Sequence, residues 1–349
     1  MKTNNVLQPK DKVRLSLPSK GRLSTDSLEL LKSCGLHVVK PNPRQYQATI
    51  RELDELSILF QRPGDIVASV RNGSVEFGIS GLDIVEENQG DSDEILILHD
   101  GLKFGQCALK LAVPESWDKI RNIDDLRRYS HEMNTEAQEY STKSKIRVAT
   151  KFPKLTQRFL ENENIPHTLI SAEGTLETAP DIGYADMIAD LVSSGQTLRD
   201  NRLRTLDAGT ILNSQAVLIG NMQTLRNNPL SLQVARYLLE YFEAYLRARD
   251  NVAIFANIRG SSPEEISDKL FAQDTIGGLQ GPTISQVIVR NTEESWYAIN
   301  IIVKRSDLYE AVTELRSIGG SGVIVNPVSY IFEEEPPLYT AMLKALNLN

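Results

Sequence analysis

The sequence has few of the residues that most often bind metals or carry redox chemistry. Its 349 residues include two cysteines, Cys34 and Cys107, and four histidines. Neither set shows the C-x-x-C or H-x-x-x-H spacing that is typical of zinc sites. Both cysteines are therefore predicted to be reduced, small residues of the core, and a zinc site is not expected.

Positive charge and long apolar runs are also scarce. Lysine and arginine total 38 against 46 acidic residues, a net charge of −8, and no basic stripe is present to meet a nucleic-acid backbone. The longest apolar runs, such as residues 298–303, are far shorter than a bilayer span, and residues 1–10 lack the apolar core of a signal peptide. We therefore expect a protein of the cytoplasm, or of a soluble compartment that it reaches by a signal not recognisable in the sequence, with neither a nucleic-acid nor a membrane partner.

The length and the rhythm of the chain predict several domains. A chain of 349 residues exceeds one ordinary core. Up to residue 249, short apolar runs alternate with helical segments, which favours parallel α/β sheets that bind ligands at their strand ends. We expect two lobes around a cleft, residues 1–111 with 206–249 and residues 112–205. The polar segment 127–145 is predicted to be a mobile surface insertion.

Residues 250–349 follow a different pattern. Strand-like and helical segments alternate in the order βαββαβ, with Ser262 and Ser306 as predicted N-caps of the two helices. This order is the ferredoxin-like arrangement, in which two helices cover one face of an antiparallel sheet. Because no catalytic set of residues is evident there, binding or assembly is the more natural role. Residues 333–337 are predicted to be a solvated tail, with a short docking helix formed by Leu338, Tyr339 and Leu343 as the alternative for the end of the chain.

Residues 188–199 carry the strongest candidate site. An apolar strand that contains Asp190 ends in a loop of hydroxyl, glycine and amide residues. The loop consists of Ser193, Ser194, Gly195, Gln196 and Thr197. A turn that opens a helix leaves backbone N–H groups for an anion, glycine permits close approach, and hydroxyls add donors. The loop is therefore a candidate phosphate site, although taken alone a capped turn without a ligand is the commoner explanation.

Two other strand ends are candidate ligand sites. They are Lys20, Gly21 and Arg22 after the first strand, and Gly81 and Asp83 after a later one. Basic residues between a strand and a helix suit an anionic ligand, but a solvated turn explains them equally well. Asp83 either faces a ligand or caps the helix that follows it.

Several separate segments share sequence with one known family. They are residues 18–24 (PSKGRLS), 78–81 (GISG), 147–150 (RVAT), 174–180 (GTLETAP), 190–198 (DLVSSGQTL) and 281–285 (GPTIS). These segments resemble ATP phosphoribosyltransferase, the first enzyme of histidine biosynthesis, in its long form with a C-terminal regulatory domain. The segment 190–198 is similar to the family signature D-L-V-S-T-G-x-T-L, with Ser194 at a position where threonine is usual.

The resemblance implies a fold and a reaction. The fold is a two-lobed α/β core like that of periplasmic binding proteins, followed by a ferredoxin-like, ACT-like domain. In the reaction, N1 of the ATP adenine attacks C1 of phosphoribosyl pyrophosphate, and pyrophosphate leaves with Mg²⁺ that the substrate phosphates mainly hold. This chemistry needs neutralised phosphate charge and a carboxylate near the cationic sugar, but no covalent nucleophile. Inhibition by histidine and a homo-hexamer or dimer are also implied.

The resemblance also implies roles for residues of this sequence. The loop 193–197 would hold the 5-phosphate of phosphoribosyl pyrophosphate, with Asp190 and Glu177 facing the ribose or the developing cation. Lys20 would be the third catalytic residue. The remaining assigned residues are Gly21, Arg22, Gly81 and Asp83, which with Lys20 would bind ATP, and Thr283 and Ser285, which would contact inhibitory histidine.

Another class of protein fits the same pattern. Two α/β lobes around a cleft also describe solute-binding and sensing proteins, which bind small anions without turning them over. A third alternative is a ferredoxin-like assembly module fused to an inactive pair of lobes. Release of pyrophosphate that depends on ATP distinguishes the enzyme from both.

Overall fold

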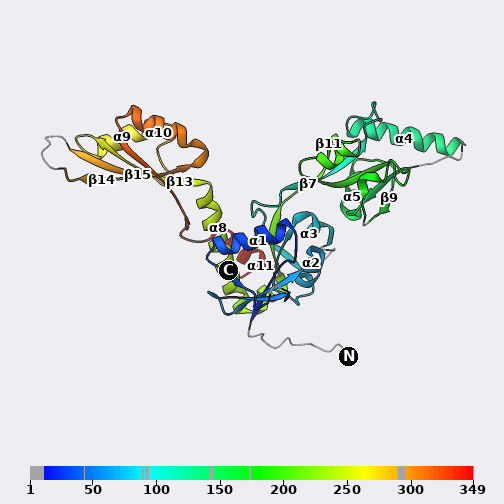
Figure 1. Cartoon of the computed structure of the whole chain (residues 1–349), viewed down its shortest axis with the longest axis horizontal. Helices are drawn as coiled ribbons and strands as arrows, with labels where there is room; N and C mark the ends of the chain where they lie inside the picture. Colours follow the sequence, from blue (N-terminus) through cyan, green and yellow to red (C-terminus); the bar gives the residue numbers. More distant parts are fainter. Residues whose placement is uncertain are drawn as a thin grey trace. The chain divides into compact units, whose positions relative to one another are not determined.

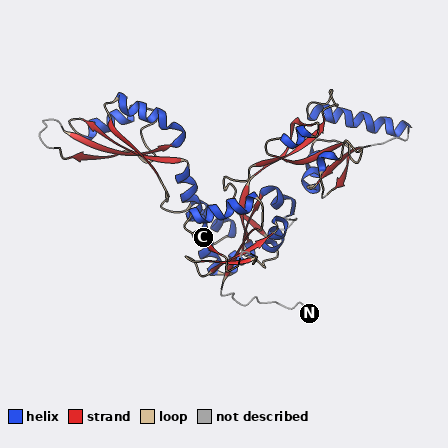
Figure 2. Cartoon of the chain, viewed as in Figure 1, coloured by secondary structure: helices blue, strands red, loops and turns tan. Residues whose placement is uncertain are grey.

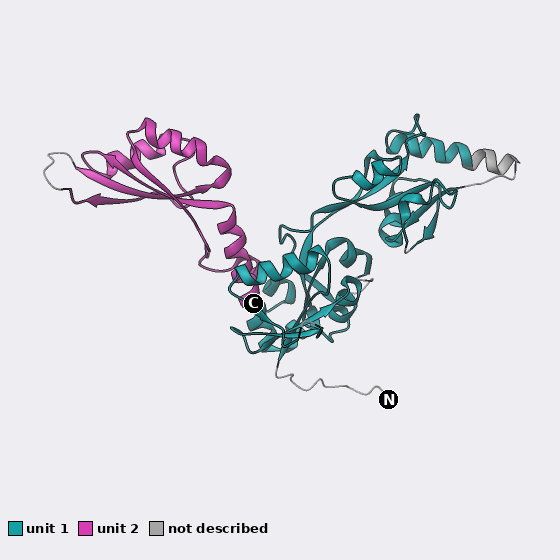
Figure 3. Ribbon diagram, viewed as in Figure 1, with its two compact units in different colours: residues 1–235, 342–349 teal, residues 236–341 magenta. Residues whose placement is uncertain are grey.

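The computed structural model describes residues 12–42, 44–88, 90, 94–140, 145–172, 174–289 and 295–348. Its strands form three sheets (Figure 1, Figure 2). The chain divides into two compact units, Met1–Ala235 with Met342–Asn349, and Arg236–Ala341 (Figure 3). Within the described ranges, no helix is long and apolar enough to cross a membrane.

A seven-stranded sheet with the order β2-β3-β4-β1-β5-β12-β6 forms the first lobe of the first unit. Its strands are β1 (Val13–Pro18), β2 (Val38–Val39), β3 (Gln47–Ile50), β4 (Leu56–Gln61), β5 (Phe77–Gly81), β6 (Ile95–His99) and β12 (Ala216–Asn221). The helices that follow β1, β4, β5 and β12 are α1 (Arg22–Ser33), α2 (Pro63–Arg71), α3 (Leu82–Asn88) and α7 (Met222–Asn227). Every residue of β5 and β12 is buried, as expected for central strands covered on both faces.

A five-stranded sheet with the order β11-β7-β10-β8-β9 forms the second lobe. Its strands are β7 (Cys107–Pro114), β8 (Ile146–Thr150), β9 (His167–Ser171), β10 (Met187–Val192) and β11 (Leu203–Ser214). β8 is parallel to β9 and β10, whereas β7 is antiparallel to β10 and β11. Its two faces pack on different helices. They are α4 (Ile123–Tyr140) and α5 (Pro153–Asn162) on one face, and η1 (Leu176–Thr178) and α6 (Gln196–Asp200) on the other.

The long strands β7 and β11 connect the two lobes. The chain enters the five-stranded sheet at Cys107 and leaves it after Ser214, and β12 then returns to the seven-stranded sheet. The lobe boundaries expected after residues 111 and 205 therefore lie inside strands. An apolar run predicts a strand, but it does not reveal which sheet that strand joins.

The mobile insertion predicted at residues 127–145 is wrong for the part that the structure describes as helix. α4 extends from Ile123 to Tyr140, and residues 141–144 lie outside the described ranges. Ile123, Leu126 and Ser130 are buried at helical spacing against the sheet. The apolar stripe begins before residue 127, so the polar remainder alone showed no periodicity.

The second unit contains the ferredoxin-like sheet. Its order is β14-β15-β13-β16, and each neighbouring pair is antiparallel. The strands are β13 (Asn251–Arg259), β14 (Thr283–Val287), β15 (Trp296–Lys304) and β16 (Ser321–Pro327), and the helices are α9 (Pro263–Phe271) and α10 (Leu308–Ser317). Both helices pack on one face of the sheet, so the predicted architecture is confirmed.

The two predicted helix caps of this unit have different outcomes. Ser262 Oγ accepts the Glu265 N–H at 3.2 Å, which confirms Ser262 as the N-cap of α9. Ser306 does not cap α10, because a 3-10 turn, Arg305–Asp307, intervenes and makes Asp307 the N-cap.

The long helix α8 (Pro229–Arg249) and the terminal helix α11 (Pro337–Leu346) each contribute residues to both units. In the first unit, Met342 and Leu346 are buried, and Leu346 O accepts a hydrogen bond from Arg226 Nε at 3.3 Å. The docking helix that was one alternative for the end of the chain is therefore confirmed.

Asn221 ties the end of β12 to α2 and α7, which gives a test of the first lobe. Its Oδ1 accepts the Thr224 N–H at 2.8 Å, and its Nδ2 donates to Val70 O at 2.8 Å in a side chain that is 3% exposed. Asn221→Ala should lower the free energy of unfolding by about 2 kcal/mol, because buried backbone groups lose their partners. The measurement is chemical denaturation. Asn88→Ala, which removes an exposed amide, is the control and should cost less than about 0.5 kcal/mol; equal losses would contradict this account.

Candidate active site

Asp190 lies near the carboxyl end of β10, where strand pairing brings lysines beside it. In the parallel pair of β10 and β8, Ala189 lies opposite Thr150, so Asp190 and Lys151 are the next residues along the two strands. In the antiparallel pair of β10 and β7, Asp190 lies opposite Lys110. Residues that are far apart in the sequence thus form one group with an acid between two lysines.

The surroundings of Asp190 raise the pKa of its carboxyl above the ordinary value. Partial burial is the largest cause, because it removes water from the charged form, and the charge of Glu177 adds to the increase. Two groups oppose it: the Leu191 N–H, which donates to Asp190 Oδ1 at 2.8 Å, and the positive charge of Lys151. A partly dehydrated carboxylate gains more from an approaching cation than a fully hydrated one.

Glu177 lies over the same face of the sheet as Asp190. Its neighbours in and after η1, Leu176 and Ala179, are buried in a cluster with Ile188 of β10. Because side chains alternate along a strand, Ile188 and Asp190 share a face. The apolar anchor therefore holds the half-buried Glu177 close enough for its charge to act on Asp190. The structure brings these two predicted residues together.

The hydroxyl-rich loop follows β10 directly. Gly195 has φ of +71° and is the N-cap of α6, a conformation that favours glycine. Ser194 Oγ accepts the Gln196 N–H at 3.4 Å, and the Gln196 side chain turns away to donate to Asp200 at 2.6 Å. Ser193 and Thr197 are exposed, so their hydroxyls stay accessible. The loop is thus open to a ligand, and Gln196 does not fill it.

Lys20, Gly21 and Arg22 form the turn between β1 and α1. Gly21 has φ of +80° and is the N-cap of α1, with nothing within 4 Å of an added Cβ. Lys20 is exposed, and Arg22, with its side chain 84% exposed, pairs with Asp26 at 3.4 Å. Among the described residues, no hydrogen bond or ion pair joins this turn to Asp190 or Glu177. The structure therefore leaves the two groups of predicted residues apart.

Gly81, the last residue of β5, and Asp83, in the first turn of α3, are both buried. Asp83 is 4% exposed, its Oδ1 accepts a hydrogen bond from Ser214 Oγ at 2.6 Å, and its N–H donates to Ser214 Oγ at 3.0 Å. A Cβ on Gly81 would come within 2.4 Å of Asp83 Oδ1. Asp83 therefore joins α3 to the end of β11. Contact of Gly81 and Asp83 with ATP stays a prediction.

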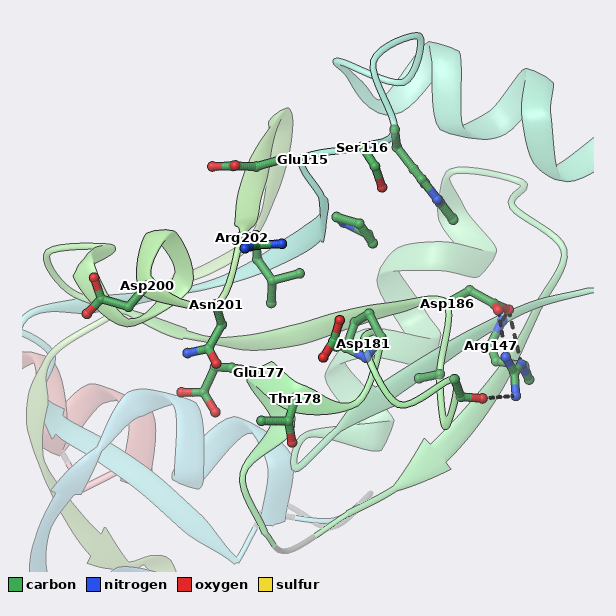
Figure 4. A pocket seen from close by; sticks show the side chains of 16 residues that line it. Glu115, Ser116, Arg147, Glu177, Thr178, Asp181, Asp186, Asp200, Asn201 and Arg202 are labelled. Carbon is green, nitrogen blue, oxygen red and sulfur yellow. Dashed lines mark hydrogen bonds and ion pairs between the residues drawn. The ribbon is translucent and has the colours of Figure 1, made fainter.

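A hollow of about 820 Å³ opens at the amino ends of β8 and β10, the end of the five-stranded sheet opposite to Asp190 (Figure 4). Arg147 at the start of β8 lines it, with Asp186 just before β10. Figure 4 shows these two side chains joined, with Arg147 Nη2 donating to Asp186 Oδ1 at 2.7 Å. Asp190 and Lys151 belong to the carboxyl ends of the same strands, and Glu177 alone of the predicted residues lines the hollow. We therefore place the candidate site at the carboxyl ends and not in this hollow.

Thr283 and Ser285 lie on the open face of the ferredoxin-like sheet. They alternate with Ile284, which packs toward the helices, and both are exposed. In the pairing of β14 and β15, Thr283 lies opposite Asn300. Asn300 Oδ1 is buried and has no hydrogen-bond partner among the described residues. This face therefore contains an acceptor that lacks a donor.

Sequence reasoning missed Lys151 and Lys110. Lys151 directly follows the segment 147–150, and it is adjacent to Asp190 only because β8 and β10 are parallel in one register. Lys110 lies within an apolar strand, where a lysine is itself an unusual feature. Both lysines could have been found only by predicting which strands pair and in which register, because neither belongs to a sequence motif.

The fold and the site define a class of protein: a two-lobed α/β protein with a candidate phosphate-binding site at its strand ends and a ferredoxin-like domain in the same chain. Comparison with known proteins then gives the family. Residues 62–242 match the family described as ATP phosphoribosyltransferase, and residues 248–330 match HisG, C-terminal domain. The chain belongs to the ATP phosphoribosyltransferase family.

Individual relatives agree with this family. ATP phosphoribosyltransferase 2, chloroplastic, of Arabidopsis thaliana is 41% identical over 343 residues, which cover 97% of this chain and 82% of the relative. ATP phosphoribosyltransferase of Gemmatimonas aurantiaca is 33% identical over 90% of this chain and 98% of its own. A solved ATP phosphoribosyl transferase (HisG:HisZ) complex from Thermotoga maritima shares the fold, with a TM-score of 0.50 and 23% identity over 66% of this chain and 98% of that one.

The predicted family, fold class and enzyme class are confirmed by these findings. The protein is a phosphoribosyltransferase of histidine biosynthesis. The alternative of a non-catalytic anion-binding protein is set aside.

The raised pKa of Asp190 generates a prediction that separates function from stability. In the folded state the ionised carboxyl is disfavoured, so above the folded pKa the charge costs stability, and below the ordinary value of about 3.9 the cost disappears. Asp190→Asn should lower kcat/KM by more than about tenfold, or about 1.4 kcal/mol. Its free energy of unfolding at neutral pH should equal or exceed that of the parent, and the difference should shrink on acidification.

Steady-state kinetics and denaturation at neutral and acidic pH measure both quantities. Asp181→Asn, at an exposed acid of the hollow in Figure 4, is the matched control and should change neither. A clear loss of stability in Asp190→Asn at neutral pH would show that this carboxylate is structural.

Proposed function

We propose that Asp190, Glu177 and the loop 193–197 bind phosphoribosyl pyrophosphate in this enzyme. The observation that carries the proposal is the group at the carboxyl ends of β8 and β10, where Asp190 meets the charges of both Lys151 and Glu177. The loop supplies exposed hydroxyls beside a left-handed glycine, which suits the 5-phosphate. The two carboxylates then face the ribose, where positive charge develops.

In the proposed reaction, charged side chains stabilise the sugar and the phosphates while one bond forms and another breaks. The lone pair of adenine N1 forms the bond to C1 of the sugar, while the C1–O bond breaks and its electron pair leaves on pyrophosphate. Asp190 and Glu177 stabilise the positive charge that develops on the sugar in between. Lys151 and Lys110 provide positive charge for the phosphate groups. No covalent intermediate with the protein is needed.

Lys20, Gly21 and Arg22 are proposed to bind the phosphates of ATP or the leaving pyrophosphate. The support is chemical: two exposed cations flank a glycine at the N-cap of α1, a twelve-residue helix whose first N–H groups favour an anion. Of these three residues, Lys20 is the one that we propose to be catalytic.

Mg²⁺ is the proposed cofactor, and the substrates are its proposed ligands. Among the residues the structure describes, no three His, Cys, Asp or Glu side chains gather as a protein-built metal site requires. Magnesium commonly binds through substrate phosphates with few protein ligands, so the residues present fit this mode. When bound, the ion neutralises the charge of the leaving pyrophosphate.

Lys151 offers the sharpest test of the substrate site. Lys151→Ala should raise the KM for phosphoribosyl pyrophosphate by about tenfold, because a cation beside Asp190 is lost. Lys154→Ala removes the same charge from an exposed residue of α5 and is the matched control, with a change below about twofold. Both are measured by product absorbance with ATP, phosphoribosyl pyrophosphate and Mg²⁺. Equal effects of the two substitutions would contradict a specific role for Lys151.

Histidine is the proposed inhibitor, bound on the open face of the ferredoxin-like sheet. Thr283 and Ser285 supply exposed hydroxyls there, and the free ammonium of histidine is a donor that Asn300 Oδ1 lacks in the described structure. Inhibition from this domain is a coupling between two distinct sites. A homo-hexamer or dimer and a cytoplasmic location stay predictions.

Point substitutions test this regulation better than truncation. Removal of residues 251–349 would also remove Met342 and Leu346, which are buried in the catalytic unit. The double variant Thr283→Ala, Ser285→Ala should raise the histidine concentration for half-inhibition by about tenfold and leave the uninhibited rate unchanged. Thr313→Ala, at an exposed hydroxyl of α10, is the control. An unchanged response to histidine in the double variant would place the inhibitor elsewhere.

A further inference from the structure

Glu87 at the end of α3 reaches from the first lobe to the second. Its side chain is buried, with 7% exposure, although it carries a carboxylate. Oε1 accepts the N–H of Lys154 at 2.9 Å, and Oε2 accepts the N–H of Leu155 at 3.0 Å. Both donors belong to the first turn of α5, whose N–H groups have no partner within the helix.

Glu87 caps the N-terminus of α5, which has no capping side chain of its own. Phe152 is the N-cap residue, and it has no side chain that can accept a hydrogen bond. Thr150 Oγ1 accepts the Phe152 N–H at 3.0 Å and so shapes the turn from within. The remaining first-turn donors, the N–H groups of Lys154 and Leu155, are bound by Glu87, which lies 67 and 68 positions earlier in the chain, on a helix of the first lobe.

The rest of α3 joins the same contact. Ile84 packs against Phe152 and Leu155 in a small apolar cluster. Glu86 pairs with Arg158 of α5 at 3.6 Å. With Asp83 bound to Ser214 at its other end, α3 contacts both the connecting strand β11 and the start of α5. Glu87 is the member of this set whose charge is directed at backbone groups.

The loop that Glu87 fixes contains Lys151. Residues 151 and 152 are the entire connection between β8, which ends at Thr150, and α5, which begins at Pro153. Pairing of Thr150 with Ala189 holds one end of this connection, and Glu87 holds the other. The position of Lys151 beside Asp190 therefore depends on both ends.

We propose that Glu87 is a positioning residue for the substrate site: by capping α5 from the first lobe, it holds Lys151 in place beside Asp190. The inference rests on the proposed role of Lys151 in binding phosphoribosyl pyrophosphate. Glu87 would thus couple the first lobe to the proposed phosphate site of the second lobe through hydrogen bonds to the backbone of α5, without contact with the substrate.

A double-mutant cycle tests the link. Glu87→Ala should raise the KM for phosphoribosyl pyrophosphate by about fivefold to tenfold with a smaller change in kcat, and Glu87→Gln, which keeps an acceptor oxygen, should recover part of this loss. In the Lys151→Ala background, Glu87→Ala should add less than about twofold. Glu86→Gln removes the same charge from the neighbouring residue and should leave KM unchanged.

Hydrogen exchange gives a readout that does not depend on catalysis. In Glu87→Gln the amides of Lys154 and Leu155 should exchange several-fold faster, while those of α4 in the same lobe stay unchanged. A KM that is unaffected by Lys151→Ala would overturn the proposed role of Lys151. Additive effects of the two substitutions, or unchanged exchange at these amides, would instead overturn the inference about Glu87 and leave the role of Lys151 intact.

Discussion

The parallel pairing of β8 with β10 is the constraint on which the candidate site depends. Register places Thr150 opposite Ala189, and the next residue on each strand then presents a lysine and an acid at the same level. A shift of one residue would move Asp190 to the face occupied by α4 and α5, away from Glu177 and the loop after it. The buried cluster of Ile188, Leu176 and Leu198 therefore specifies the site as well as the core, because it fixes which face of β10 carries Asp190.

The same residues show that the proposed substrate site does not stabilise the fold. Asp190 is held where its charge is partly dehydrated, and the acid nearest to it has the same sign. This arrangement costs stability in the folded protein, and under the proposed function it favours the positive charge that develops on the sugar during the reaction. Glu87 contrasts with Asp190, because its buried carboxylate is fully used by two backbone N–H groups. The two acids differ in the origin of their donors: Glu87 accepts two N–H groups of another helix, whereas Asp190 accepts the N–H of its own neighbour Leu191.

Much of the fold could be predicted from the sequence because it depends on local patterns. The βαββαβ order of the last domain and the cap at Ser262 depend on residues close in the chain. The loop after β10 could be found because its hydroxyls and glycine are consecutive. Lys151, Lys110 and Glu87 could not be found this way, since their partners come from other strands and helices. The hydrogen bond of Asp83 could not be predicted for the same reason, because its partner Ser214 is 131 residues away.

In the second unit, the local sequence pattern predicts which face of a strand a residue occupies, but not which residue lies opposite it on the next strand. Alternation along β14 is enough to place Thr283 and Ser285 on one face and Ile284 on the other. It does not reveal that Asn300 lies opposite Thr283 with a buried, unbonded oxygen, because that depends on the register of β14 with β15. A buried acceptor without a donor costs free energy, and for this reason Asn300 supports the proposal that histidine binds at this face.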